Sequence, residues 1–184
     1  MNELTNNSIE VKALDPDMVS EITKTTIEAK SNGINIVGLN FQTTKGGIPE
    51  GISLLDVMHK SEVEFITNGN GELTLGAILP LAGGKFGERK ADAAATFVFR
   101  EDTKTEGKKR KALSASEKNS LEILDKLSGG RKARIKAFMH SGSRITAAEM
   151  VSLGLVDKTI GGFVDKYEQA RKDAKEEAKK NKKK

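Results

Sequence analysis

The fold is decided by two stretches of sequence, Thr43-Thr44-Lys45-Gly46-Gly47-Ile48-Pro49-Glu50-Gly51 and Asn70-Gly71-Glu72-Leu73-Thr74-Leu75-Gly76-Ala77. In each stretch, glycines form a turn between an apolar, strand-like run and a helix-like run. Two successive strand–turn–helix units predict a parallel sheet, because parallel strands need a crossover connection between them. The turns of such a sheet open on one edge, which is where α/β folds place their chemistry.

Apolar periodicity and turn residues predict the other elements. Strands are expected over residues 8–13, 34–41, 63–67, 94–100 and 155–160. Helices are expected from Asp15 to the break at Asn32-Gly33, over 48–59, 74–82, 116–127 and 131–139, from Thr146 to Gly154, and over 163–180. Residues 68–71, Asn-Gly-Asn-Gly, are expected to form a loop.

Two of these helices carry clear start signals. Asp15 is expected to cap a helix whose first turn holds Pro16. Thr146 and Glu149 have the spacing of a capping box.

The same pattern predicts burial. Ile9, Val11 and Ala13 alternate as on a half-buried strand. Residues 34–41 are apolar on both faces, which is typical of a central parallel strand. One side of the second helix is expected to consist of Ile48, Ile52, Leu55 and His59.

Composition limits the classes of function. The 184 residues fit one domain with a core, and the chain is 36% hydrophobic and 31% charged. The absence of cysteine excludes disulfides, cysteine nucleophiles and thiolate metal sites, and it suits a reducing cytoplasm. No signal-peptide pattern and no run near the roughly 18 apolar residues of a membrane span is present, so a soluble protein is expected. Two isolated histidines predict no metal site, and we expect no cofactor.

The net charge of +5 is concentrated in two places. One is the basic run of Lys108, Lys109, Arg110 and Lys111, and the other is the Lys-rich tail that ends at Lys184. Such segments are able to contact nucleic acid or another polyanion. The alternative is a solvated loop and a solubilising terminus.

The turn at Gly46 and Gly47 is a candidate anion site. Backbone N–H groups in a concave glycine turn before a helix bind phosphate, carboxylate or a developing oxyanion. The turn is not a Walker loop, and residues 69–74 do not complete a dinucleotide fingerprint, because position 74 is threonine. The alternative is that these glycines only permit sharp turns.

Several segments together carry a resemblance to a known family. They are the strand over 34–41, Gly46-Gly47, Gly51, Asp56-Val57-Met58, the helix over 75–83, Gly87-Glu88-Arg89-Lys90, and the pair of segments 145–150 and 155–158. In order and spacing they resemble the proteolytic subunit of the Clp protease, within the Clp–crotonase superfamily. The resemblance covers most of residues 9–160. It implies a Clp/crotonase-type α/β fold with stacked ββα units, a mainly parallel sheet and a C-terminal helical segment.

The resemblance also implies where a catalytic triad would lie. The family's nucleophilic serine falls on Thr74, its histidine on Phe99, and its aspartate on residues 139–143, which contain no acid. Phenylalanine cannot accept a proton, so the triad is expected to be lost. The family's oxyanion-hole backbone corresponds to Gly46-Gly47 and Leu75, and we expect it to be retained.

Other residues are candidates to replace the missing base. They are His59, His140, Lys45 and Lys85, and Ser141 and Ser143 are alternative nucleophiles.

The expected organisation is a Clp-protease-like domain over residues 1–162, with 101–140 as a reduced, handle-like excursion, and a charged Lys-rich helix or tail over 163–184. Gly129-Gly130 interrupts the handle region. Leu121, Leu124 and Leu127 form an apolar stripe that is expected to bury against a neighbouring subunit, giving a homo-oligomer.

The sequence therefore predicts a catalytically inactive Clp-protease-like subunit that acts through assembly or binding to a peptide or protein. The alternatives are an active serine or threonine peptidase, for example of phage head-maturation type, and a crotonase-like acyl-CoA-binding protein. The resemblance implies a cytoplasmic location, in a bacterial or phage-infected cell.

Overall fold

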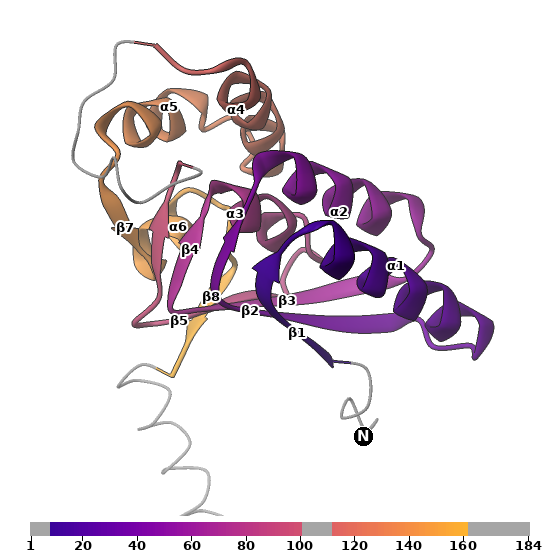
Figure 1. Ribbon diagram of the computed structural model, residues 1–184. Helices are drawn as coiled ribbons and strands as arrows, with labels where there is room; N and C mark the ends of the chain where they lie inside the picture. Colours follow the sequence, from indigo (N-terminus) through magenta and orange to yellow (C-terminus); the bar gives the residue numbers. More distant parts are fainter. Residues whose placement is uncertain (1–7, 101–111, 162–184) are drawn as a thin grey trace, which may run out of the picture.

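The computed structural model describes residues 8–100 and 112–161 (Figure 1). Its larger sheet has five parallel strands in the order β1-β2-β3-β5-β8. These strands are β1 (Ser8–Leu14), β2 (Ile36–Gly46), β3 (Glu64–Asn70), β5 (Arg89–Asp92) and β8 (Lys158–Ile160). The mainly parallel α/β fold that the sequence predicts is therefore confirmed. The predicted helix over 163–180 and the basic run over 108–111 lie outside the described residues.

A smaller sheet lies beside the first. It consists of β4 (Glu72–Thr74), β6 (Thr96–Val98) and β7 (Arg144–Thr146), with β4 parallel to β6 and β6 antiparallel to β7. The helices are α1 (Pro16–Ser31), α2 (Ile48–Lys60), α3 (Leu75–Ala82), α4 (Ala115–Leu127), α5 (Lys132–Ser141) and α6 (Ala147–Ser152).

The predicted helix starts are confirmed in detail. The Asp15 carboxylate accepts a hydrogen bond from the Met18 N–H at 2.8 Å, and Pro16 occupies the first turn of α1. Thr146 caps α6, and its N–H and hydroxyl both donate to the Glu149 carboxylate, which completes the capping box. Local capping chemistry thus sets both boundaries.

The helices that connect the first parallel strands all cover one face of the larger sheet (Figure 1). Parallel crossovers are almost always right-handed, and the strand order advances in one direction, so successive helices are placed on the same side. Along β3, Phe65, Thr67 and Gly69 are buried while the alternate residues are not. The prediction that 34–41 is covered on both faces is therefore wrong within the described chain.

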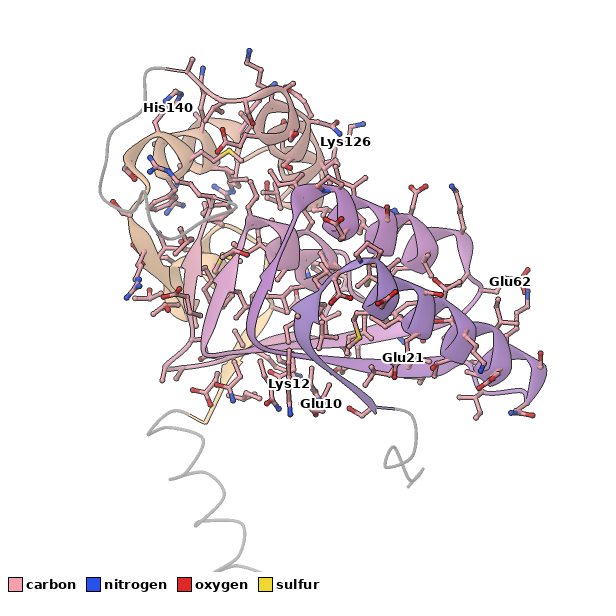
Figure 2. All side chains as sticks on the ribbon, in the orientation of Figure 1. Glu10, Lys12, Glu21, Glu62, Lys126 and His140 are labelled. Carbon is pink, nitrogen blue, oxygen red and sulfur yellow. The ribbon has the colours of Figure 1, made fainter. Side chains whose placement is uncertain are left out.

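The uncovered face of the larger sheet is polar. Asn40 of β2 donates hydrogen bonds to Ser8 and to Glu10 of the neighbouring strand β1, at 2.7 and 2.9 Å. Glu10 and Lys12 project from this face in Figure 2.

Several predicted strands differ from the observed ones. The run over 94–100 is expected beside 34–41 and 63–67 in one sheet, but its strand, β6, belongs to the smaller sheet. The strand that pairs with β3 on its other side in the larger sheet is β5. It is not predicted, because its polar sequence, Arg-Lys-Ala-Asp, has no apolar strand pattern. The expected loop at 68–71 is also wrong at its start, because β3 continues to Asn70 in register with Gln42. β8 is shorter than predicted, and the short strands β4 and β7 are not predicted.

Two burial predictions are wrong for local reasons. The pairing of β1 with β2 shifts between Val11 and Ala13, so the next buried residue is Leu14 and Ala13 is exposed. His59 is exposed at the end of α2, where Leu54 and Met58 take the inward positions.

The leucine stripe of α4 belongs to this chain's own core. Leu121 and Leu124 are buried in the core cluster, Leu127 is partly buried against it, and α4 contacts α2 and α3. The expectation that this stripe faces a neighbouring subunit is therefore wrong.

Candidate active site

Thr74 stands at the junction of β4 and α3. It is the N-cap residue of α3, with φ −91° and ψ 170°, but its side chain does not cap the helix. It is 1% exposed, and every residue of the following helix is buried. The predicted nucleophile position is thus at a strand-to-helix turn, as expected, and is buried.

The structure brings the two glycine-bearing stretches together at this turn. Gly47 is the N-cap of α2, and Gly46 ends β2, where it is paired with Leu14. The carbonyl oxygens of Gly46 and Gly47 lie so close to Gly76 that a Cβ on Gly76 would collide with them. Both glycines have extended or strand backbone, not the positive φ angles of an anion-binding nest, so the expected free glycine turn is a strand end that packs on α3.

The other predicted oxyanion donor has a partner within the backbone. The Leu75 N–H donates a hydrogen bond to the Arg100 carbonyl at 2.9 Å. This bond ties the start of α3 to the end of the β6 segment.

Phe99 lies just beyond β6 and is fully buried. Its ring stacks on the ring of Phe138, from α5, with 6.2 Å between the centroids and 16° between the planes. Aromatic pairs of this kind add about 0.5–1.5 kcal/mol beyond the burial of their area. The position that the resemblance assigns to a histidine is therefore part of an apolar contact between the smaller sheet and α5.

Arg100 is the residue of this region that sequence reasoning missed. Its side chain is fully buried, and its guanidinium donates to the carbonyl oxygens of Met139 at 3.4 Å and His140 at 3.1 Å. These carbonyls end α5, so the cation satisfies acceptors that the helix leaves free and also faces the negative end of its dipole. In the sequence, Arg100 is the first residue of the charged run that follows the mostly apolar stretch over 94–99, so nothing there marks it as buried.

The segment that the resemblance assigns to an aspartate is therefore where α5 meets Arg100. Gly142 ends α5 with φ +62°, and a Cβ there would collide with the Arg100 guanidinium. Ser141 Oγ donates to the Phe138 carbonyl at 3.1 Å and accepts from the Ser143 N–H at 3.2 Å. The two serines thus shape the turn after α5.

The other candidate bases belong to separate features. Lys85 forms an ion pair with Glu64 at 2.6 Å. His140 lines a cavity between α4 and α5, and His59 is exposed on α2. The side chain of Lys45 lies outside those that the structure describes.

Two segments that carry the resemblance meet in a buried ion pair. Arg89 of β5 and Asp157, next to β8, approach to 2.6 Å, with side chains 3% and 13% exposed. Burial raises the pKa of Asp157, but the hydrogen bonds and charge of Arg89 and the Gly87 N–H outweigh it, so its pKa lies below the ordinary value. Arg89 also donates to the Ala82 carbonyl at the end of α3, at 3.1 Å.

The structure shows neither a metal cluster nor a membrane-spanning helix in the ranges 8–100 and 112–161. No three His, Asp or Glu side chains in these ranges gather as metal ligands. No helix there is long and apolar enough to span a bilayer.

Comparison with known proteins identifies the fold. No protein-family model matches the sequence, and no curated protein matches it. Among solved structures, the crystal structure of the ClpP protease catalytic domain from Plasmodium falciparum is similar, with a TM-score of 0.73 and 18% sequence identity over 87% of this chain and 88% of that one. At this identity the likeness concerns the fold, so the chain has a ClpP-like α/β fold.

Proposed function

We propose that this protein is a non-catalytic version of the ClpP-like fold, acting in the cytoplasm through homo-oligomeric assembly or through binding of a peptide or protein. The observation that carries the proposal is the stack of Phe99 on Phe138 at the position where the resemblance places the catalytic base.

The chemistry of acyl transfer supports this proposal. A threonine or serine hydroxyl becomes a nucleophile only when a base within hydrogen-bond reach removes its proton. Loss of one triad member costs about 10⁴-fold or more in rate. In addition, the Leu75 N–H, which by the resemblance would be an oxyanion-hole donor, donates its hydrogen bond to the Arg100 carbonyl.

A fluorophosphonate probe tests the proposal directly, because it labels only activated hydroxyls. We expect neither labelling nor peptide hydrolysis by the purified chain, and no difference between the wild type and Thr74→Ala. Wild-type labelling that disappears in Thr74→Ala would establish the alternative, an active peptidase. Labelling that persists in Thr74→Ala would direct attention to Ser141 and Ser143.

A second test restores two residues of the triad and asks whether activity returns. We expect Thr74→Ser combined with Phe99→His to remain unlabelled, because no acid in residues 139–143 would orient the imidazole and Arg100 occupies that position. The control is Phe86→His, the same substitution at a side chain that is 84% exposed.

A further inference from the structure

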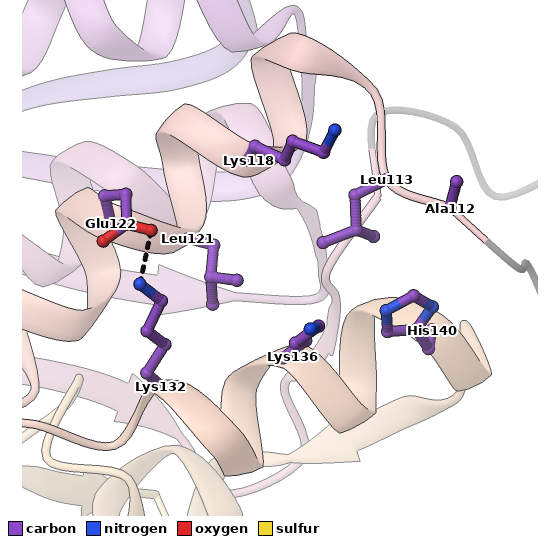
Figure 3. Close-up of a pocket in the computed structure, with 8 residues that line it drawn as sticks. All are labelled: Ala112, Leu113, Lys118, Leu121, Glu122, Lys132, Lys136 and His140. Atoms are coloured by element: carbon purple, nitrogen blue, oxygen red, sulfur yellow. Dashed lines mark ion pairs between the residues drawn. The ribbon is translucent and has the colours of Figure 1, made fainter.

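A cavity of about 450 Å³ lies between α4 and α5, and Figure 3 shows it in close-up. This α4–α5 pocket is lined by Ala112, Leu113, Lys118, Leu121, Glu122, Lys132, Lys136 and His140. Its volume lies within the range of about 300–1,000 Å³ that is typical of ligand pockets. His140 is shared with the Thr74 region, because its carbonyl oxygen accepts a hydrogen bond from Arg100 while the residue also lines the pocket.

The pocket combines an apolar floor with a basic rim. Leu113 and Leu121 are 7% and 4% exposed and form the floor. Lys118 of α4 and Lys136 of α5 stand on opposite helices, and both side chains are exposed. In the part of the chain that the structure describes, neither of these two lysines has an acidic partner.

The remaining charges of the pocket do not cancel this excess. Lys132 forms an ion pair with Glu122 at 2.5 Å across the two helices, as Figure 3 shows. Among the lining residues that the structure describes, Glu122 is the one acidic side chain, against three lysines.

The sequence of α5 strengthens the preference for an anion. The helix has no acidic side chain in its first turn, and Lys132 and Lys136 line the pocket from its N-terminal half. Cations there oppose the helix dipole, which costs about 0.3–1 kcal/mol for each charge near the end. The Asp125 carboxylate, which accepts from the Lys132 N–H at 2.8 Å, offsets part of this charge. A bound anion would offset the rest.

We propose that the α4–α5 pocket binds an acidic peptide segment that carries one bulky apolar side chain. The apolar side chain would contact Leu113 and Leu121, and flanking carboxylates would pair with Lys118 and Lys136. A peptide fits better than a nucleic acid because, apart from the His140 imidazole, the lining residues that the structure describes include no aromatic or arginine side chain on which a base would stack. The lysines and leucines that carry this inference lie outside the Thr74 region, so the inference stands whether or not the protein is a peptidase.

The test is fluorescence anisotropy of a labelled peptide, Gly-Glu-Leu-Glu-Gly, titrated with the full chain. We expect saturable binding that weakens as salt is raised. Peptides with glycine in place of leucine, or with glutamine in place of both glutamates, should bind at least several-fold more weakly.

Charge-reversed variants locate the site. We expect Lys118→Glu with Lys136→Glu to weaken binding about tenfold or more, since both attractions become repulsions. Lys126→Glu is the matched control, because Lys126 is an exposed lysine of the same helix that does not line the pocket (Figure 2). Unchanged circular dichroism should show that the variants fold.

Four outcomes would overturn the inference. They are no binding of the acidic peptide, unchanged binding in the double variant, an equal loss in Lys126→Glu, or equally strong competition by a single-stranded oligonucleotide, which would show general polyanion binding. None of these outcomes bears on fluorophosphonate labelling, so the failure of this inference is distinguishable from the failure of the proposed function.

Discussion

Arg100 shows how one buried side chain determines the shape of the region around Thr74. Its guanidinium contacts the last carbonyls of α5, and its own carbonyl accepts from the Leu75 N–H at the start of α3. One residue therefore connects two helices and the smaller sheet. An arginine is suited to this role because its guanidinium has five N–H donors and keeps its positive charge at any pH at which the protein folds.

Gly142 is the residue that makes room for this arginine. It has φ +62°, and a Cβ would meet the guanidinium, whereas Gly129 has φ +69° and a Cβ there would have nothing within 4 Å. We expect Gly129→Ala to lower the free energy of unfolding by about 1–2 kcal/mol, the cost of a left-handed non-glycine residue. Gly142→Ala should cost about 2 kcal/mol more, because the collision is added. Urea denaturation of the two variants measures the difference. Equal losses of unfolding free energy in the two variants would mean that the Arg100 side chain can move to make room for a Cβ at position 142.

Gly76 has the corresponding role where two helices begin. A Cβ on Gly76 would collide with the carbonyl oxygens of Gly46 and Gly47, whereas a Cβ on Gly38 would meet only Ser8, with Oγ at 3.3 Å. We expect Gly76→Ala to lower the free energy of unfolding by about 3 kcal/mol and Gly38→Ala to leave it within about 1 kcal/mol of the wild type. Chemical denaturation is again the measurement. A much smaller loss of unfolding free energy in Gly76→Ala would indicate that the N-termini of α2 and α3 can move apart at little cost.

At the scale of elements, the Arg89–Asp157 pair holds the edge of the larger sheet. It links β5 to the segment before β8, and through Ala82 it reaches the end of α3. Removing one partner of a buried pair leaves the other charge uncompensated. We expect Asp157→Asn to lower the free energy of unfolding by about 3 kcal/mol at neutral pH.

The pH dependence of this loss has a definite sign. The pKa of Asp157 is lowered in the folded state relative to its ordinary value of 3.8, so its contribution is present above that value and is lost as the pH falls through the folded pKa. The stability difference between the wild type and Asp157→Asn should therefore shrink below about pH 4. Asp56→Asn is the control, since Asp56 forms only an exposed pair with Lys60 and should stay close to the wild type. A difference that is independent of pH would contradict this account.

The elements that the sequence predicts well are those with local signals. Asp15 and the Thr146–Glu149 box define helix starts through contacts within one turn, and these are confirmed. β5 is not predicted and β6 is predicted in the wrong sheet, because distant partners decide both positions: Arg89 pairs with Thr67, and Phe97 pairs with Ile145. No periodicity within three or four residues encodes such a pairing.

The region around Thr74 is predictable only in part for the same reason. The sequence predicts the strand-to-helix turn, and the resemblance predicts the lack of a base at Phe99. That Phe99 stacks on Phe138, and that Arg100 contacts the end of α5, depend on residues about 40 positions apart meeting in space. The polar face of the larger sheet is hidden in a similar way, because residues 34–41 are mostly apolar, although the described helices cover only one side of the sheet.

At the scale of the whole molecule, the leucine stripe of α4 contributes to the stability of the single chain and gives no evidence about its assembly. The proposal of a homo-oligomer rests on the resemblance and not on this stripe, because Leu124 is fully buried within the chain itself. Light scattering at tens of micromolar is expected to give a mass well above the 19.9 kDa of one chain. A mass equal to one chain would refute the assembly part of the proposal.

Leu124→Ala then distinguishes the two roles of α4. Because the side chain is in the core, we expect the substitution to lower the free energy of unfolding by about 2–5 kcal/mol and to leave the mass of the folded particles unchanged. The control is Ile27→Ala, which truncates a side chain that is 61% exposed on α1 and should change stability by less than about 1 kcal/mol. If Leu124→Ala reduced the mass while the thermal midpoint stayed constant, the stripe would be an intersubunit contact, and the packing of α4 on α2 and α3 would not be its main role.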